Sequence, residues 1–418
     1  MLERQVDQLV GHLFRQEAGK MAAVLTRLLG FGNLETAEDI VQDTLLKAVT
    51  VWKFKGIPEN PSAWLYTVAR RKAIDTLRQR KVREHIQEEI SRSLNSEWTL
   101  SPTVSQLFME NEIEDSQLRM IFACCHPAIP YDSQIALTLK TLCGLSIHEI
   151  ARNFLTSEET IIKRLYRARE KIRTEKIDLE VPVAEHLPAR LEVVWHTLYL
   201  VFNEGYNSSH SHQLIRDDLC EEAMRLCLLL TLNPVTDTPG TNALLALMCL
   251  HASRVGSRLG THGEIILLRD QDRNLWNKSL IEKGLEYLSK ASEGNVVTEY
   301  HLEAAIGACH AVAEDFEKTD WKKIHSLYES LSKIRKDAVV EMNKAIALGY
   351  CLSPQAALSA LLSIKGLEET HLYHAALGDF YKEIKDFRNS RQAYDKAMSF
   401  TVSKQEKDLL EKKKTSLT

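Results

Sequence analysis

The sequence is poor in the residues that interrupt helices, cross-link chains or enter membranes. Its 418 residues include 17 glycines and 10 prolines, a scarcity that favours a largely helical chain over a strand-rich one. Eight cysteines are present and no pair has C-x-x-C spacing, so we expect reduced core thiols rather than disulfides or a zinc ribbon. The longest apolar run, residues 243–250, is well short of the roughly 20 residues of a membrane-spanning helix.

A secretion signal is also missing. The first ten residues, MLERQVDQLV, lack the basic and then apolar order of a signal peptide, so we expect a cytoplasmic protein with no membrane association. A chain of this length is too long for one compact domain and suggests two or three.

Charge is nearly balanced, at a net −4, but it is unevenly distributed. Residues 63–83 carry seven basic side chains and one acidic one, residues 84–117 carry eight acidic and one basic, and residues 159–173 carry six basic and two acidic. A solvated surface helix normally mixes its charges. Two basic segments separated by an acidic one are therefore a pattern that requires a functional explanation.

Hydrophobic spacing predicts the helices of the N-terminal half. Apolar residues recur at helical intervals over residues 6–29, 37–53 and 61–83, and a Gly- and Pro-containing loop lies at 55–61. The acidic, serine-rich stretch at 85–115 has weak periodicity and predicts a linker with one short helix at most. Further helices are expected at 118–125 and 132–143.

Residues 145–173 predict a helix-turn-helix unit. The first helix has an apolar face of Ile147, Ile150, Ala151 and Phe154, and the second one of Ile161, Leu165, Ala168 and Ile172. Thr156 or Ser157 is the expected N-cap of the second helix, and Thr156 with Glu159 has capping-box spacing. The residues expected to point outward are Thr160, Lys163, Arg164, Arg167 and Lys171.

The remainder, after Pro182, predicts helix upon helix with a weak repeat of about 34 residues near the end. The small and aromatic packing residues of a tetratricopeptide helix pair match Leu377, Gly378, Tyr381, Ser390, Tyr394 and Ala397. A degenerate upstream partner lies at 345–362, so an α-solenoid-like tail is expected.

Three segments, in this order, resemble an extracytoplasmic-function (ECF) sigma factor of bacterial RNA polymerase. They are AEDIVQDTLLKA (37–48), NPSAWLYTVARRKAIDTLRQRK (60–81) and the helix-turn-helix at 145–173. Other segments resemble a subgroup with a long helical, tetratricopeptide-like C-terminal extension: FACCHPAIP (122–130), LYLVFNEGY (198–206), YHLEAAIGACHA (300–311) and DWKKIHSLY (320–328).

The resemblance implies an all-α fold of four parts. A region-2-like domain (1–83) would bind core polymerase and the −10 element, and an acidic linker (84–117) would follow it. A region-4-like helix-turn-helix domain (118–178) would bind the −35 element, and residues 179–418 would form the helical extension. The partners implied are core RNA polymerase, promoter DNA and a protein or peptide that binds the extension.

The resemblance also implies site residues. The residues implied for polymerase binding are Glu38, Asp39, Gln42, Asp43 and Lys47. Opening the −10 duplex requires cations and a stacking surface for an unstacked base, which implies Trp52, Lys53, Phe54, Asn60, Tyr66, Arg70, Arg71, Lys72 and Arg78. Reading the −35 element in the major groove falls to Ser157, Glu158, Glu159, Thr160, Lys163, Arg164 and Arg167.

Two other classes of protein stay open. The first is a tetratricopeptide-type scaffold, or a helix-turn-helix DNA-binding regulator that works without polymerase. The second is an enzyme, which would need a metal at the cluster Glu204, His210, His212, Asp217 and Asp218. That cluster lacks a complete catalytic constellation, and adjacent Cys124 and Cys125 cannot easily share one metal ion. We therefore expect a non-catalytic protein without a metal or cofactor.

Overall fold

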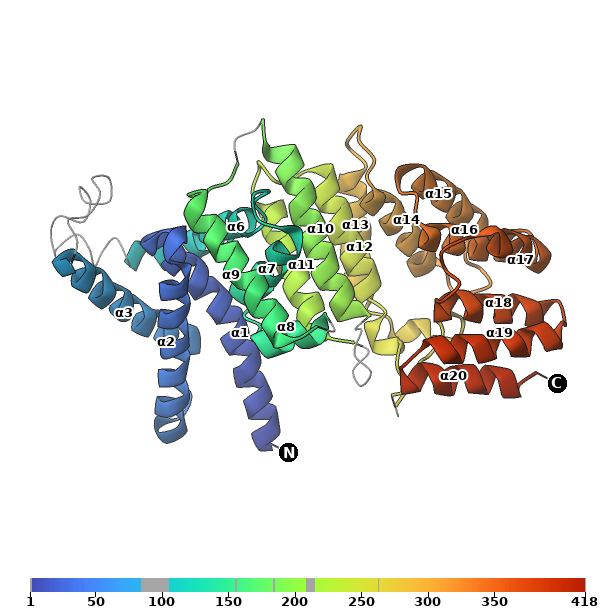
Figure 1. Ribbon diagram of the computed structural model, residues 1–418, viewed down its shortest axis with the longest axis horizontal. Coiled ribbons are helices and arrows are strands. Elements are labelled where there is room, and N and C mark those ends of the chain that lie inside the picture. The colour runs from blue at the N-terminus through green and yellow to red at the C-terminus, as the bar shows by residue number, and fades with distance from the viewer. Residues whose placement is uncertain are drawn as a thin grey trace. The chain divides into compact units, whose positions relative to one another are not determined.

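The computed structural model describes residues 2–83, 105–154, 156–182, 185–207, 215–261 and 263–417, and the chain forms two compact units (Figure 1). Unit 1 contains Met1–Glu204 and Glu221–Leu229, and unit 2 contains Gly205–Cys220 and Leu230–Thr418. Over the described ranges the regular elements are all helices, besides one isolated bridge between Leu259 and Ile265. The all-α fold is thus confirmed. None of the described helices combines the length and the apolar character needed to cross a membrane.

Unit 1 begins with three helices that share one core. They are α1 (Leu2–Leu29), α2 (Leu34–Lys55) and α3 (Pro61–Arg83), with a short 3-10 turn, η1 (Phe31–Asn33), after α1. Gly30 and Gly56 end α1 and α2 with φ of +85° and +78°, a conformation that favours glycine. The side-chain oxygen of Asn60 accepts a hydrogen bond from the Ala63 N–H at 2.9 Å and caps α3.

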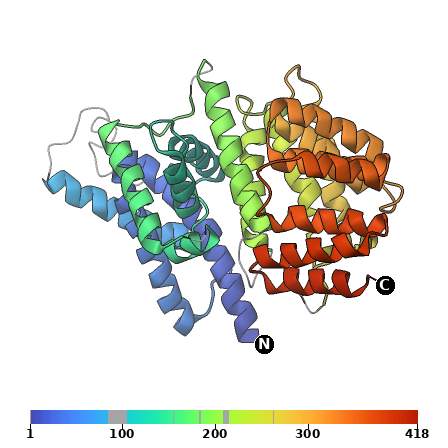
Figure 2. The ribbon, with the colours of Figure 1, turned by 45° about the vertical axis from the view of Figure 1, so that its right-hand side comes forward.

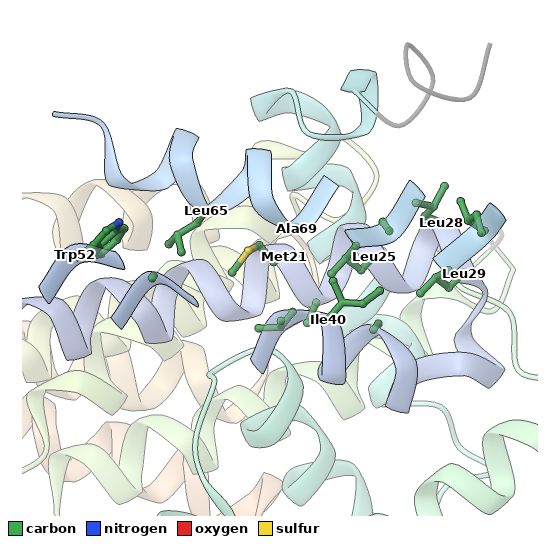
Figure 3. Packing of buried hydrophobic residues seen from close by; sticks show 14 residues of the cluster. Met21, Leu25, Leu28, Leu29, Ile40, Trp52, Leu65 and Ala69 are labelled. Atoms are coloured by element: carbon green, nitrogen blue, oxygen red, sulfur yellow. The ribbon is translucent and has the colours of Figure 1, made fainter. Parts of the chain in front are cut away.

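The core of these helices is built by the predicted apolar spacing (Figure 3). Met21 and Leu25 of α1 meet Ile40 of α2 and Leu65 and Ala69 of α3, and all are buried. Burying such side chains contributes about 1.5–3 kcal/mol each relative to exposure. This core fixes the direction in which the opposite, polar faces of α2 and α3 point.

The second half of unit 1 starts earlier than the sequence predicted. Helix α6 (Glu110–Cys124) begins inside the stretch expected to be a linker. It packs on α1, where Arg27 forms ion pairs of 2.9 Å with both Glu112 and Asp115. Acidic residues are favoured in the first turns of a helix, so part of the negative charge serves a helix start. The rest of the expected linker, residues 84–104, lies outside the described residues.

The helix-turn-helix predicted at 145–173 is formed by α8 (Ile147–Asn153) and α9 (Glu158–Thr174), and α7 (Tyr131–Thr141) packs on both. Ser146 and Glu149 form a reciprocal capping box at the start of α8, with N–H···O distances of 2.8 and 3.1 Å. Ser157 caps α9 by accepting from the Thr160 N–H. The stripe of apolar residues predicted to face inward on α9 is buried, as expected: Ile161, Leu165, Ala168 and Ile172.

Unit 1 also includes most of α10 (Leu187–Tyr206) and the middle of α11 (Asp217–Leu232). Arg190 donates to the Phe122 carbonyl at 2.5 Å, and the Cys125 thiol donates to the Thr197 hydroxyl at 3.6 Å. Helix α10 therefore covers the inner side of α6. The compact unit extends past residue 178, where the sequence analysis placed the start of the extension.

Unit 2 is a succession of antiparallel helices, each packed on the next. They are α12 (Pro239–Ala252), α13 (Lys278–Ala291), α14 (Glu299–Val312), α15 (Trp321–Ile334), α16 (Ala338–Cys351), α17 (Pro354–Ser363), α18 (His371–Glu383), α19 (Phe387–Phe400) and α20 (Lys404–Thr415). Three short 3-10 turns lie between α12 and α13: η2 (Val255–Ser257), η3 (Leu268–Asp270) and η4 (Arg273–Leu275). Helices α18, α19 and α20 lie side by side as the red layer of Figure 2.

The predicted tetratricopeptide-like packing is present between α18 and α19. Tyr394 is fully buried against Gly378, where an added Cβ would lie 2.5 Å from the ring. The Ser390 hydroxyl donates to the Gly378 carbonyl at 2.8 Å. The degenerate upstream repeat corresponds to the helix pair α16 and α17.

Candidate nucleic-acid interface

The last turn of α2 presents an exposed aromatic ring next to a lysine in the sequence, and α3 presents exposed arginines. Phe54 is 82% exposed, and Lys53, Arg71 and Arg78 are also exposed. An exposed ring beside Lys and Arg is what stacking on an unpaired base requires. This part of the predicted −10 site is accessible.

Trp52 is a correction. Its side chain is only 7% exposed and lies in the buried cluster of Figure 3. The Trp52 ring contacts Phe14 and Trp64 at ring-centroid distances of 5.4 and 5.5 Å. It is part of the hydrophobic core and cannot stack on a base. Tyr66 is half-buried against Phe108, and its burial, followed by the nearby Glu17 carboxylate, raises the pKa of the phenol. Its ring face is therefore occupied within the chain.

Two of the predicted −10 cations have partners in the chain. Arg70 donates to the Ser105 hydroxyl at 2.9 Å, and Lys72 forms an ion pair with Asp43 at 2.6 Å. Both partners are exposed or partly exposed, and exposed ion pairs contribute at most about 1 kcal/mol. DNA phosphates can compete for these cations.

The predicted polymerase-binding face of α2 is largely accessible, with one correction. Asp39, Gln42, Asp43 and Lys47 are exposed. Glu38 is not free for a partner: its side chain is 12% exposed and accepts a hydrogen bond from Arg169 of α9 at 2.5 Å. Burial raises the pKa of the Glu38 carboxyl, and Arg169 and Lys140 oppose that shift.

Helix α9 presents the predicted −35 residues at its N-terminal half. Lys163 and Arg167 are exposed, and Thr160 is partly exposed. Arg164 pairs with Asp132 at 2.9 Å, Glu158 with His148 at 2.8 Å, and Glu159 with Lys163 at 2.7 Å. Glu159 thus stabilises the helix surface instead of closing the capping box expected with Thr156.

Exposed Tyr166 and Ile162 of α9 were missed by the sequence analysis. Tyr166 is 61% exposed and Ile162 is 51% exposed, beside Lys163 and Arg167. Apolar contacts to thymine methyl groups are part of base readout. The signal in the sequence was a large apolar side chain off the buried stripe.

A tight contact joins the two halves of unit 1. An added Cβ at Gly19 of α1 would lie 2.0 Å from the Leu142 carbonyl oxygen, and one at Gly144 would lie 2.9 Å from the Arg15 carbonyl oxygen. Arg169 also reaches Glu35 at 3.5 Å. A small cavity of about 90 Å³, lined in part by Glu38 and Lys140, lies in the same contact. Only glycine allows this approach of the two backbones.

The other candidates offer no metal or catalytic centre over the described ranges. Asp218 pairs with Arg216 at 2.8 Å, and burial beside Asp218 raises the pKa of Asp217. His210 and His212 lie outside the described residues. No group of three potential ligands is close enough to hold a metal in the part of the chain that the structure describes. Cys124 and Cys125 are buried thiols, as predicted, while Cys351 is exposed.

These features define a helical DNA-binding protein of two small domains, each presenting a basic helix, followed by a helical repeat unit. Comparison with protein families matches both small domains. Residues 13–83 match sigma-70 region 2, residues 119–172 match sigma-70 region 4, and residues 190–292 match a family of unknown function, DUF6596.

Individual relatives support the same assignment. An ECF RNA polymerase sigma-E factor of Haemophilus influenzae is 31% identical over 37% of this chain and 79% of its own length. The ECF RNA polymerase sigma factor SigW of Bacillus subtilis is 24% identical over 35% and 79%. An uncharacterized protein of Rhizobium meliloti is 36% identical over 90% of this chain and 88% of its own. No solved structure matches. The chain belongs to the ECF family of RNA polymerase sigma factors and carries a C-terminal extension.

Proposed function

We propose that this sigma factor binds core RNA polymerase, directs it to specific promoters and helps to open the −10 region. The observation that carries the proposal is the pair of basic, exposed helix surfaces on α3 and α9, each on its own domain in the order of regions 2 and 4. Region 2 would use Phe54, Arg71 and Arg78, and region 4 would use Lys163 and Arg167. The protein would act in the cytoplasm without catalysing a reaction.

The exposed acidic face of α2 supports polymerase binding. Asp39 and Asp43 project from the side of α2 opposite its buried stripe, so a basic partner surface can reach them. Complementary charge mainly speeds and orients association.

The conformation of unit 1 supports a closed resting state. The −10 and −35 elements are about 25 base pairs apart, roughly 85 Å of duplex, whereas α2 and α9 are in direct contact through Glu38 and Arg169. Both helices cannot reach their elements while this contact holds. Opening at the Gly19 and Glu38 contacts would therefore accompany promoter binding.

The extension is proposed to regulate initiation in cis through a protein or peptide partner. Residues 180–418 carry 28 basic and 33 acidic side chains, and a net acidic helical repeat suits a basic protein surface better than DNA. The fragment that tests this should end after residue 232, because both α10 and the middle of α11 belong to unit 1.

The decisive experiment is transcription in vitro with purified core polymerase and genomic promoter fragments. The wild-type chain should give promoter-specific transcripts, and Phe54→Ala should reduce open-complex formation at least tenfold. Leu352→Ala, which alters a 71% exposed apolar residue of unit 2, is the matched control and should leave opening unchanged.

A second arm tests polymerase binding. Asp39→Lys should weaken capture of core polymerase severalfold, and Glu192→Lys, an exposed acid of α10, should not. The opposite result is that the protein binds promoter DNA while transcription stays the same whether or not it is added. That result would instead favour a regulator that works without polymerase.

A further inference from the structure

Unit 2 contains a group of arginines that has no carboxylate partner among the residues that the structure describes. Arg254 and Arg258 flank η2, Arg273 begins η4, and η2 and η4 are in contact. The side chains of His251 from α12 and His310 from α14 complete the group. We call these five residues the arginine cluster.

Aromatic rings hold the arginines close together. The Cζ of Arg258 lies 4.0 Å and that of Arg254 6.0 Å from the centre of the Tyr206 ring. The Cζ of Arg273 lies 4.8 Å from the Trp276 ring centre. His251 meets the same Tyr206 ring at 5.1 Å. Two guanidinium groups therefore lie near the same ring, where their like charges repel each other.

The hydrogen bonds of the cluster go to neutral acceptors. Arg258 donates to the Tyr206 carbonyl, and Arg273 donates to the carbonyls of His310 and Ala313 at the end of α14. Arg254 makes no side-chain hydrogen bond to any residue that the structure describes. Its buried Nε has no acceptor there, nor do the buried Nη2 of Arg273 and Nδ1 of His310.

Nearby acids do not neutralise this charge. The carboxylates that act on Arg273 are Asp315 and Glu317, and each lies 3.9 Å from another cation, Lys318 and Arg269 respectively. Burial lowers the pKa of both histidines, and the nearby Arg254 lowers it further, to about 3. Both rings are therefore neutral at pH 7 and can donate or accept hydrogen bonds.

The frame that carries the cluster is ordered by its own contacts. The Ile266 N–H donates to the Arg258 carbonyl at 2.9 Å, and the Asn277 N–H donates to the Ser253 carbonyl at 2.7 Å. Gln271 donates to the Ile266 carbonyl at 3.1 Å. The cations are thus held in place before any ligand arrives, which lowers the entropy cost of binding.

We propose that the arginine cluster is a binding site for a small ligand that carries a phosphoryl group. Guanidinium groups are always charged and bind phosphate through paired donors, and burying them without counter-charge is costly. A dianionic phosphoryl group matches three arginines better than a single carboxylate does. The Tyr206 and Trp276 rings would border the ligand. The site is independent of the proposed function, since binding needs neither polymerase nor DNA.

Calorimetric titration of the full-length protein tests the site, with pyrophosphate as the probe and citrate at equal ionic strength as the carboxylate arm. Pyrophosphate should bind at least tenfold more tightly than citrate. Arg254→Met should lose at least tenfold of the pyrophosphate affinity. Arg269→Met is the matched control: this arginine also stacks on a ring, Phe316 at 4.8 Å, but has carboxylate partners in Glu317 and Glu383. Its affinity should match the wild type.

Equal pyrophosphate binding by wild type and Arg254→Met would overturn the proposal, because any binding would then come from the basic helices of unit 1. Equal affinity for citrate and pyrophosphate would overturn the phosphoryl assignment. Should Arg254→Met fail to fold by circular dichroism, Arg254→Lys replaces it. That variant keeps the positive charge but loses the planar guanidinium with its paired N–H donors, so its affinity for pyrophosphate should fall severalfold.

Discussion

Two partly buried arginines, one in each unit, differ in whether a carboxylate balances their charge. In unit 1, Arg169 is neutralised by Glu38 and Glu35, which come from a helix more than 130 residues earlier in the chain. In unit 2, Arg254 faces two further arginines and two neutral histidines, and no carboxylate pairs with it in the part of the chain that the structure describes. The first arrangement is complete within the chain, and the second calls for an anion from outside it.

This difference separates a conformational contact from a ligand site. A pair such as Arg169 and Glu38 can be opened only by a partner that replaces both charges, and polymerase or DNA phosphates could do so. In the arginine cluster the like charges repel one another, and a bound anion would reduce that repulsion. The ion pair and the arginine cluster can be tested separately, because replacing the arginine by methionine should destabilise unit 1 but should not destabilise unit 2.

Gly19→Ala should have the largest effect on the closed contact. Its Cβ would lie 2.0 Å from the Leu142 carbonyl oxygen, and such overlap with backbone costs about 3 kcal/mol or more. The two halves of unit 1 should separate, so amide exchange in α7–α9 should accelerate and transcription at limiting core polymerase should rise. Gly32→Ala, with no atom within 4 Å of the new Cβ, is the control. Unaltered exchange in Gly19→Ala would contradict the contact.

Arg169→Met and Arg254→Met should differ in sign. The first leaves the Glu38 carboxylate buried without its partner and should lower the free energy of unfolding of unit 1 by about 3–5 kcal/mol. The second removes an unpaired guanidinium and should be neutral or stabilising when no oxyanion is present. Urea unfolding followed by amide exchange in α2 and α12 distinguishes the units. Equal destabilisation by both substitutions would remove the contrast between them.

Arg167 and Arg164 should differ more modestly on promoter DNA. Arg167 is exposed, whereas Arg164 is held by Asp132 at 2.9 Å. If Arg167 reads a base, Arg167→Ala should cost about 1–3 kcal/mol and relax preference at one position. Arg164→Ala should weaken all promoters alike by a smaller amount. A matrix of −35 variants measures both, and unchanged binding in both variants would exclude α9 from the groove.

Local spacing was sufficient to predict most of the helices and the core of α9. The buried stripe Ile161, Leu165, Ala168 and Ile172, and the packing of Tyr394 on Gly378, depend on residues close in sequence. The start of α6 was missed because its acidic first turn has the composition of a linker. The correct predictions and the missed helix start therefore both came from short-range sequence patterns.

The site was predicted less well because residue type does not report burial. Trp52 shares the helical spacing of buried Val41 and Ala48. That spacing correctly indicated a core residue, whereas the aromatic side chain wrongly suggested a stacking residue. The Glu38–Arg169 pair joins residues 131 positions apart, and no local pattern could predict it. The arginine cluster likewise assembles from segments between residues 206 and 310.

The pH dependence of stability should have opposite signs in the two units. In unit 2 the pKa of His251 and of His310 is lowered from 6.5 to about 3 by burial and by Arg254, with Arg258 also acting on His251 and Arg273 on His310. Below pH 6.5 the unfolded chain binds more protons than the folded unit, so stability is lost as the pH falls. The slope is at most about 1.4 kcal/mol per pH unit for each histidine.

In unit 1 the raised pKa of Glu38 acts in the other direction. The folded state holds this proton more tightly than the unfolded state, so stability falls as the pH rises through and above 4.5. Lowering the pH from 7 towards 4.5 should thus loosen α12 and α14 while it does not loosen α2 through Glu38. Amide exchange, corrected for its intrinsic pH dependence, measures both. His251→Gln should flatten the response of unit 2, and His325→Gln, outside the cluster, should not; an equal response in both variants would place the acid sensitivity elsewhere.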